Sequence, residues 1–358
     1  MRKKYLFFLV IFLFPLQVFA VSDTSYSSIV MDTSSKRVLY ENNAHEVRSV
    51  ASISKIMTAL LAIENLDLKE KVAVGEEVLP IYGTNIYVSV GEKISVKDLL
   101  YGLILRSGND AAVVLAKTVS KSEENFVKRM NQKAKEIGMK NTTFTNAHGL
   151  DDDSLGNQST AYDMALLSSY ANKYEIYRKI AGTKKYQTKT NEKSYVWYNR
   201  NKLLSKYEFA TGGKNGYTPK AGRTLVTTAT KDELSLTAVT LKDDLEYDTH
   251  ISLYEYIFQN YKNYKFIDAS DFNYEEKKNG EQLYIKESFS YPMSEKEYTS
   301  SKVVLTLDTT KKHKNKDKVG VVKVLLKDKV LYQEDVFVNI KEKEGFFKKI
   351  QKFFQKIF

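Results

Sequence analysis

Residues 52–64 are apolar on nearly every face and contain neither glycine nor proline. This pattern is typical of a helix that is buried, not one that lies on a surface. The chain has 358 residues, which is too long for one small core and predicts roughly two domains of about 150 residues each. An apolar fraction of 42% is ordinary for a globular protein. We therefore expect a large domain that encloses this helix, and further folded chain beyond it.

The net charge of +11 is concentrated at the two ends of the chain. Residues 1–20 contribute +3, residues 341–358 contribute +4, and the remaining +4 is spread over residues 21–340. A body this close to neutral does not indicate a nucleic-acid surface. Cysteine is absent, which excludes disulfides and thiolate–zinc sites, and the four histidines lack metal-ligand spacing. We expect no metal, no cofactor and no nucleic-acid partner.

The first 20 residues have the pattern of a secretory signal peptide. A basic start at residues 2–4 precedes an apolar run over residues 5–14, and Ala20 stands at the expected cleavage position. The alternative is an uncleaved N-terminal membrane helix, but the run is shorter than the ~20 residues that a span needs. Export of a chain without cysteine is typical of a bacterial protein that works outside the cytoplasm.

Hydrophobic periodicity predicts strands at both ends of the first 260 residues and helices between them. Strands are expected over residues 26–40, as two strands around a turn, and over 224–230 and 234–241, as a hairpin; helices are expected over 52–64, 95–119 with a break at 107–110, 122–137, 160–181 and 250–261. The early strands can pair with the later hairpin into one sheet with helices against it. From about residue 265 the pattern consists only of strands and turns and predicts a separate small β-sandwich.

The last 13 residues predict an amphipathic helix. Apolar residues at helical spacing are Phe346, Phe347, Ile350, Phe353, Phe354, Ile357 and Phe358, and the opposite face carries Lys348, Lys349, Lys352 and Lys356. Such a helix is too polar to span a bilayer and is typical of one that lies in the membrane plane, attracted to anionic lipid. Docking on the β-rich domain or on a partner is the alternative. We expect the segment 342–358 to anchor the chain to the outer face of the plasma membrane.

Three short motifs follow one another along the chain: Ser52-Ile53-Ser54-Lys55, Ser107-Gly108-Asn109 and Lys214-Asn215-Gly216. On a helix, Ser52 and Lys55 lie one turn apart, so the amine reaches the hydroxyl. A lysine acts as a base only where its pKa falls toward neutrality, and the apolar run after Lys55 favours that desolvation. The combination is typical of serine acyl-transfer enzymes with a lysine base.

The other two motifs predict polar groups around a cleft. At a turn between helices, Ser107 can shuttle a proton and Asn109 can hold a substrate amide, although a plain turn also explains this tripeptide. On a strand edge, Gly216 lets a substrate approach the backbone, and Lys214 adds positive potential for a carboxylate. Each motif alone is weak evidence for a function, so the prediction depends on the order of the three motifs and on their occurrence in one chain.

The sequence around these motifs resembles the low-molecular-mass penicillin-binding proteins, and specifically the D-alanyl-D-alanine carboxypeptidases. The stretches that carry the resemblance are residues 51–58, 99–112, 146–151, 161–163 and 213–218. The resemblance runs from about residue 25 to residue 260. It implies an α/β (α+β) fold of the serine β-lactamase/transpeptidase type with an all-helical lobe over residues 21–262, then a small all-β sandwich domain over 263–341, then the amphipathic helix.

The resemblance also implies a reaction. Ser52 would attack the carbonyl between the last two D-alanines of a peptidoglycan stem pentapeptide, and Lys55 would take its proton. Hydrolysis of the acyl-enzyme would follow, with Ser107 assisting proton transfer. Removal of the terminal D-alanine limits cross-linking of the cell wall. β-Lactams would acylate Ser52 because they mimic the terminal dipeptide.

The resemblance places the substrate-binding groups at Asn109 and along the third motif. Lys214 and Gly216 match the family, and the backbone amides of Ser52 and Tyr217 would form the oxyanion hole. Asn215 departs from the usual Lys-Thr-Gly: its amide donates hydrogen bonds but is longer and planar, so altered affinity or β-lactam sensitivity is expected. Two alternatives stay open, a non-catalytic peptidoglycan-binding relative and a β-lactamase, for which we identify no water-activating carboxylate.

Overall fold

The computed structural model describes residues 21–151, 156–272, 281–308 and 313–340. The predicted signal peptide over residues 1–20 and the predicted amphipathic helix over residues 342–358 lie outside these ranges. None of the helices that the structure describes combines the length and the hydropathy needed to cross a bilayer.

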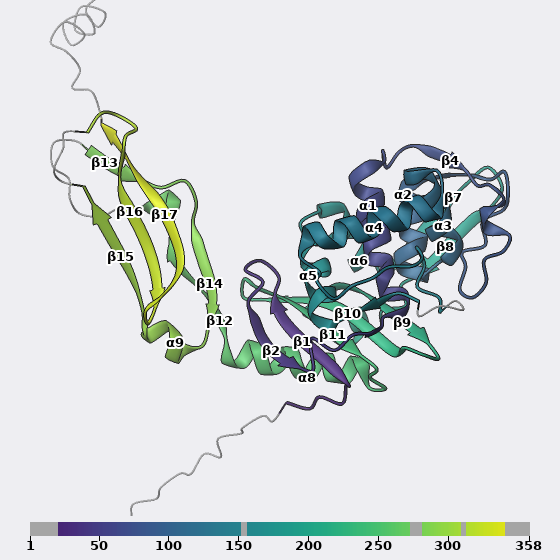
Figure 1. Cartoon of the computed structure of the whole chain (residues 1–358), viewed down its shortest axis with the longest axis horizontal. Coiled ribbons are helices and arrows are strands. Elements are labelled where there is room, and N and C mark those ends of the chain that lie inside the picture. The colour runs from purple at the N-terminus through teal and green to yellow at the C-terminus, as the bar shows by residue number, and fades with distance from the viewer. Residues whose placement is uncertain (1–20, 152–155, 273–280, 309–312, 341–358) are drawn as a thin grey trace, which may run out of the picture.

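A five-stranded antiparallel sheet forms the centre of the first 260 residues (Figure 1). Its strands are β1 (Ser27–Asp32), β2 (Val38–Asn42), β9 (Ala210–Thr218), β10 (Gly222–Lys231) and β11 (Leu234–Leu241), in the spatial order β2-β1-β11-β10-β9. The predicted pairing of the early strands with the later hairpin is confirmed, since β1 lies antiparallel to β11 along its whole length. β9 forms one edge of the sheet, where an added extended peptide can pair.

Helices cover both faces of this sheet. They are α1 (Lys55–Asn65), α2 (Val96–Tyr101), α3 (Asn109–Ser120), α4 (Glu123–Ile137), α5 (Ala161–Ala171), α6 (Glu175–Gly182), α7 (Leu203–Lys206) and α8 (Glu246–Asn260). The first eight residues of α1 are all buried, as its apolar sequence predicts. The helical lobe with α1 lies on one side of the sheet, and α8 packs on the other side through Leu253, Tyr254 and Ile257.

Three helix predictions need correction. The helix expected from residue 52 starts at Lys55, because Ala51–Ser54 form a 3₁₀ turn ahead of it. The helix expected over 160–181 is two helices, α5 capped by the Thr160 side chain and α6 after a break at residues 172–174. The helix expected at 250–261 begins earlier, at Glu246.

Short strands complete the helical lobe. They are β3 (Arg48–Ser49) with β6 (Gln158–Ser159), β4 (Lys71–Ala73) with β5 (Lys93–Ser95), and β7 (Lys185–Lys189) with β8 (Ser194–Tyr198). The predicted break between helices is confirmed: α2 runs into a π-helical turn, Gly102–Arg106, and Ser107 ends it with a left-handed φ of 65°.

Beyond α8 the chain forms two further sheets with a hydrophobic core of their own. Strand β12 (Lys262–Ile267) pairs with β14 (Phe289–Met293), and the four-stranded sheet has the order β13 (Glu281–Tyr284), β17 (Lys329–Ile340), β16 (Lys318–Leu326), β15 (Ser301–Leu307). Ile267 packs with Val322 and Val336 in this core. The expectation of strands and turns alone is wrong at α9 (Glu295–Thr299), where Ser294 and Glu297 form a capping box.

Arg37 joins the two parts of the molecule. It follows the turn between β1 and β2, donates a 2.5 Å hydrogen bond to the Pro292 carbonyl and forms an ion pair with Glu297. Its guanidinium also lies over the rings of Tyr261 and Tyr291. The Arg37 side chain, from the loop between β1 and β2, therefore contacts the end of α8, strand β14 and helix α9.

Candidate active site

Ser52 lies in the 3₁₀ turn before α1, and packing from two other segments fixes this turn. Ala51 has a left-handed φ of 49°, which a residue with a side chain rarely adopts. Thr224 of β10 donates a 3.1 Å hydrogen bond from Oγ1 to the Val50 carbonyl. Gly149 packs so closely that a Cβ there would lie 2.1 Å from the Ala51 carbonyl oxygen. The backbone around Ser52 is thus set by the fold and not by helix propensity.

Replacing Gly149 by alanine is expected to lower the free energy of unfolding by roughly 2–4 kcal/mol, from the positive φ and the backbone clash together. Gly138 is the matched control, because its φ of 93° is similar to the 82° of Gly149 but no atom lies within 4 Å of a Cβ there. Chemical denaturation of both variants measures the difference. Equal losses in Gly149→Ala and Gly138→Ala would show that the close packing under Ala51 contributes nothing.

Lys55 is completely buried beside Ser52, and its amine is held by three oxygens. Nζ lies 3.0 Å from Ser52 Oγ, 2.7 Å from Asn109 Oδ1 and 2.5 Å from the His148 carbonyl oxygen. Burial, followed by the positive charges of Lys214 and Arg200, holds the pKa of Lys55 well below its usual range. A neutral amine at hydrogen-bond distance from a hydroxyl can accept its proton.

The second motif contacts Lys55 directly through Asn109, the first residue of α3. The Asn109 Nδ2 group donates to the Tyr82 carbonyl at 2.8 Å, which fixes the amide with Oδ1 toward Lys55. Asp110, the next residue, accepts hydrogen bonds from the backbone N–H groups of residues 86–88. The sequence predicts that Asn109 contacts the substrate. In the structure the Asn109 amide also has two partners within the protein, the Tyr82 carbonyl and the Lys55 amine, so it helps to position Lys55.

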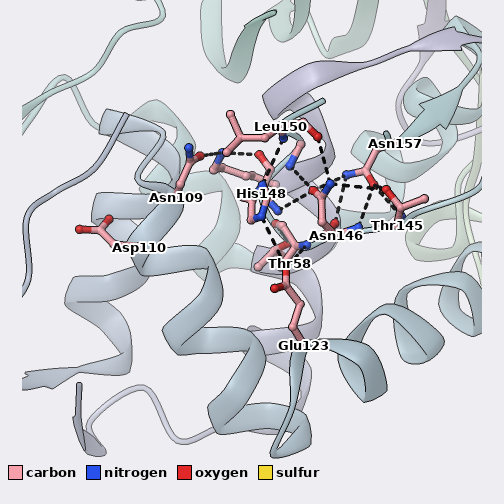
Figure 2. Close-up of polar contacts among 12 residues, drawn as sticks. Thr58, Asn109, Asp110, Glu123, Thr145, Asn146, His148, Leu150 and Asn157 are labelled. Atoms are coloured by element: carbon pink, nitrogen blue, oxygen red, sulfur yellow. Dashed lines mark hydrogen bonds and ion pairs between the residues drawn. The ribbon is translucent and has the colours of Figure 1, made fainter. Parts of the chain in front are cut away.

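The segment 145–150 supplies the third oxygen around Lys55, and Figure 2 shows the polar side chains that hold it. Asn146 Oδ1 accepts from the N–H groups of His148 and Gly149 at 3.2 and 2.6 Å. Asn157 Oδ1 accepts hydrogen bonds from the first two N–H groups of the segment. Glu123, at the start of α4, accepts a hydrogen bond from the N–H of residue 147. Sequence analysis notes this stretch only for its resemblance, because its functional atom is a backbone carbonyl.

The third motif brings β9 against the nucleophile. Lys214 is buried and donates a 2.6 Å hydrogen bond to the Asn215 carbonyl. Burial and the nearby charge of Arg200 lower the pKa of Lys214 to about 7. A Cβ on Gly216 would lie 2.8 Å from the backbone nitrogen of Ser52. The edge strand therefore approaches the Ser52 amide as closely as a glycine allows.

A cleft of about 610 Å³ opens above these groups. It is lined by Ser52, Thr84, Ser107, Asn199, Arg200, Lys202, Asn215, Gly216, Tyr217, Arg223, Glu246 and Tyr247. Every residue that the motifs single out lies in this lining or directly behind it, as Lys55, Asn109 and Lys214 do. Among the described residues, no group of three or more histidine, aspartate or glutamate side chains is arranged to hold a metal ion.

Three charged residues of the cleft lining, Arg200, Arg223 and Glu246, are not predicted from the sequence. Arg200 follows β8 and donates to Thr84 Oγ1 at 3.1 Å, while Arg223 at the start of β10 lies 3.5 Å from Glu246 on α8. No local pattern marks these three charged residues, because strand order and helix packing bring them to the cleft. Of these three residues, only Arg223 lies close to the third motif in the sequence, and Lys220 lies closer still.

Comparison with known proteins decides the family. A sequence model described as D-alanyl-D-alanine carboxypeptidase matches residues 17–244. The chain belongs to this family. Among curated members, it is 39% identical over 219 residues to D-alanyl-D-alanine carboxypeptidase DacF of Bacillus subtilis, and 36% identical over 250 residues to DacC of Escherichia coli. These matches cover 60% and 64% of the chain, and the chain spans only 56% and 61% of the length of those relatives.

Solved structures of the family have the same fold. Penicillin binding protein 5 from Haemophilus influenzae superposes with a TM-score of 0.71 at 25% identity, covering 89% of this chain and 97% of that one. The Streptomyces K15 DD-transpeptidase gives a TM-score of 0.63 at 29% identity, covering 66% of this chain and 98% of that one. The predicted mixed helix-and-sheet fold of the transpeptidase type is therefore confirmed.

Proposed function

We propose that the chain is a serine-type D-Ala-D-Ala carboxypeptidase, a penicillin-binding protein that removes the terminal D-alanine from peptidoglycan stem pentapeptides. The observation that carries the proposal is the 3.0 Å contact between Ser52 Oγ and the amine of Lys55, which is buried and has a lowered pKa. The family and the names of the curated relatives support the same substrate class.

In the acylation step, neutral Lys55 accepts the Ser52 proton while Oγ attacks the carbonyl carbon of the penultimate D-alanine. The carbonyl oxygen becomes an oxyanion, which the backbone amides of Ser52 and Tyr217 stabilise. The C–N bond then breaks, and the proton passes from Lys55 by way of Ser107 to the departing amine of D-alanine. Water hydrolyses the ester and restores the Ser52 hydroxyl.

The stem peptide binds as an added strand along the edge of β9, where Gly216 leaves room for its backbone. Lys214 adds positive potential, and Asn215 donates a hydrogen bond to the terminal carboxylate in the place of the usual threonine. A β-lactam occupies the same cleft and acylates Ser52.

Within the same proposal, residues 21–262 carry the catalysis and residues 263–341 form a separate β-rich domain. The signal peptide over residues 1–20 exports the chain, and the helix over residues 342–358 places it on the outer face of the bacterial plasma membrane. The charge and apolar pattern of those two end segments supports this location.

The pKa of Lys214, about 7, predicts a pH dependence of substrate binding. The amine is protonated below pH 7 and neutral above it, so its attraction for a carboxylate is lost as the pH rises. We expect KM to increase roughly tenfold between pH 6 and pH 9, the effect of about 1.4 kcal/mol of electrostatic attraction. Steady-state assays of Lys214→Arg, whose charge does not titrate, are expected to show a flat KM; a rise equal to that of wild type would contradict this role.

The proposed function is tested by measuring the intact mass of the protein after incubation with a penicillin, with Ser52→Ala in parallel. A stable adduct on wild type but not on Ser52→Ala establishes the acyl-enzyme, and release of D-alanine from a pentapeptide then identifies the activity. Absence of any adduct would favour the non-catalytic relative that Asn215 suggests. Rapid turnover of the penicillin, without trapping, would favour a β-lactamase.

A further inference from the structure

The cleft contains more positive charge than the three motifs explain. Arg200, Lys202 and Arg223 line it, and Glu246 is the acidic residue of the lining. Lys214 behind the wall has a pKa of about 7, so at neutral pH it is only partly charged. An arginine keeps its charge at every pH at which the protein is folded. The countercharge for a carboxylate in this cleft therefore comes from the cationic side chains of the lining, Arg200, Lys202 and Arg223.

The strand register selects Arg223 among them. In the β9–β10 pair, Gly216 lies opposite Thr224, Asn215 opposite Leu225, and Tyr217 opposite Arg223. The Cβ direction at Gly216 points to the Ser52 amide. Since side chains alternate along a strand, Asn215 and Arg223 project together toward the other face, where α8 lies.

Asn215 and Arg223 are diagonal neighbours across two adjacent strands, a spacing that a long side chain can bridge. The Arg223 guanidinium lies over the Tyr217 ring at 6.0 Å and 3.5 Å from Glu246, and its side chain is 54% exposed to the cleft and solvent. Glu246 is 8% exposed and holds the guanidinium from behind. Arg223 is therefore half exposed in the cleft, on the strand next to Asn215.

Arg200 is placed differently. Its Nη1 group donates to Thr84 Oγ1, and its carbonyl accepts from the Tyr247 hydroxyl, so it connects two walls of the cleft. No carboxylate is recorded within ion-pair distance of Arg200 in the described part of the chain. Arg200 acts on Lys55 and Lys214 through its charge, which lowers both pKa values.

We infer that Arg223, oriented by Glu246, is the residue that binds the terminal carboxylate of the substrate, together with the side-chain amide of Asn215. This inference rests on the proposed function and deepens it. The planar guanidinium presents two parallel N–H groups to a carboxylate, and Asn215 adds a third donor. Arg223 supplies the positive charge, and Asn215 donates a directional hydrogen bond to the carboxylate. Together they take the place of the threonine hydroxyl that is usual in the family.

The test compares two pentapeptides that differ only at the end, one with a free D-alanine carboxylate and one with a terminal carboxamide. Release of D-alanine or of D-alaninamide is measured by mass spectrometry for wild type, Arg223→Ala, Arg200→Ala and Lys202→Ala. For Arg223→Ala we expect kcat/KM to fall roughly 10- to 100-fold on the acid and less than about threefold on the amide. Lys202→Ala removes one positive charge from the same lining and is expected to affect the acid less than about threefold.

Retained hydrolysis of the amide shows that a variant is folded. Glu246→Gln, which keeps the size of the side chain, is expected to give part of the same loss on the acid, and Arg223→Lys to recover part of it. An equal fall of kcat/KM on both peptides in Arg223→Ala would overturn this inference and leave the proposed function intact. So would a preference for the acid over the amide that is lost in Arg200→Ala but kept in Arg223→Ala. A wild-type protein inactive on both peptides would overturn both.

Discussion

Replacing Lys55 by methionine is expected to lower the rate at which a penicillin acylates Ser52 by roughly 10²- to 10⁴-fold at pH 7, which is the usual contribution of a general base. Methionine fills most of the buried space of the lysine stem but cannot accept the Ser52 proton. Stopped-flow measurement with a fluorescent penicillin gives the rate directly. In wild type the rate is expected to rise with pH as the Lys55 ammonium loses its proton, because only the neutral amine is a base.

Lys55→Arg is the informative control for this prediction. Arginine keeps a positive charge next to Ser52 but does not deprotonate in a protein, so it cannot act as the base. Its acylation rate is expected to be as low as that of Lys55→Met and to show no rise with pH. A rate close to wild type would mean that Lys55 acts by charge alone and that another group takes the proton.

Replacing Gly216 by alanine is expected to lower acylation by roughly 10²- to 10³-fold, the cost of losing one oxyanion donor. The new Cβ would lie 2.8 Å from the Ser52 nitrogen and 2.6 Å from Thr224 Oγ1, so β9 must move away from the nucleophile. The substrate carbonyl oxygen can then no longer lie between the backbone amides of Ser52 and Tyr217. Acylation kinetics and the adduct yield at long times both report the change.

A double variant separates the two clashes at this position. Thr224→Ala removes the hydroxyl that crowds the new Cβ, and with it the hydrogen bond to the Val50 carbonyl, so the single variant Thr224→Ala is measured in parallel as the reference. We expect Gly216→Ala with Thr224→Ala to stay as slow as Gly216→Ala alone, because the contact with the amide persists. Recovery of the rate in the double variant would assign the loss to crowding at Thr224 and not to the oxyanion position.

Much of the fold follows from patterns that a sequence carries locally. The two strands within residues 26–40 and the hairpin of β10 and β11 pair as expected, and the burial of α1 follows from its lack of a polar face. The capping box at Ser294 and Glu297 was also present in the sequence and marks a helix that periodicity alone misses. Such short-range signals fail at residues 172–174, where α5 has ended at Ala171 and α6 begins only at Glu175.

The candidate site was predictable where its chemistry belongs to side chains in the three motifs. The carbonyls of His148 and Tyr82, which hold Lys55 and Asn109, carry no residue identity and therefore no sequence signal. Arg223 and Glu246 meet because β10 is the neighbour of β9 and α8 covers that face, which is known only once the strand order is known. The signal peptide and the amphipathic helix stay predictions.

The turn around Ser52 also determines when during folding the protein becomes reactive. Thr224 contacts Val50 across 174 residues of chain, and Arg37 contacts Pro292 across 255. Neither contact can form before the chain extends through residue 224 or residue 292 and the loop between the two partners has closed. A growing or partly folded chain thus contains the serine but neither its cleft nor its oxyanion donors. A penicillin should therefore label completely folded molecules covalently and leave folding intermediates unlabelled.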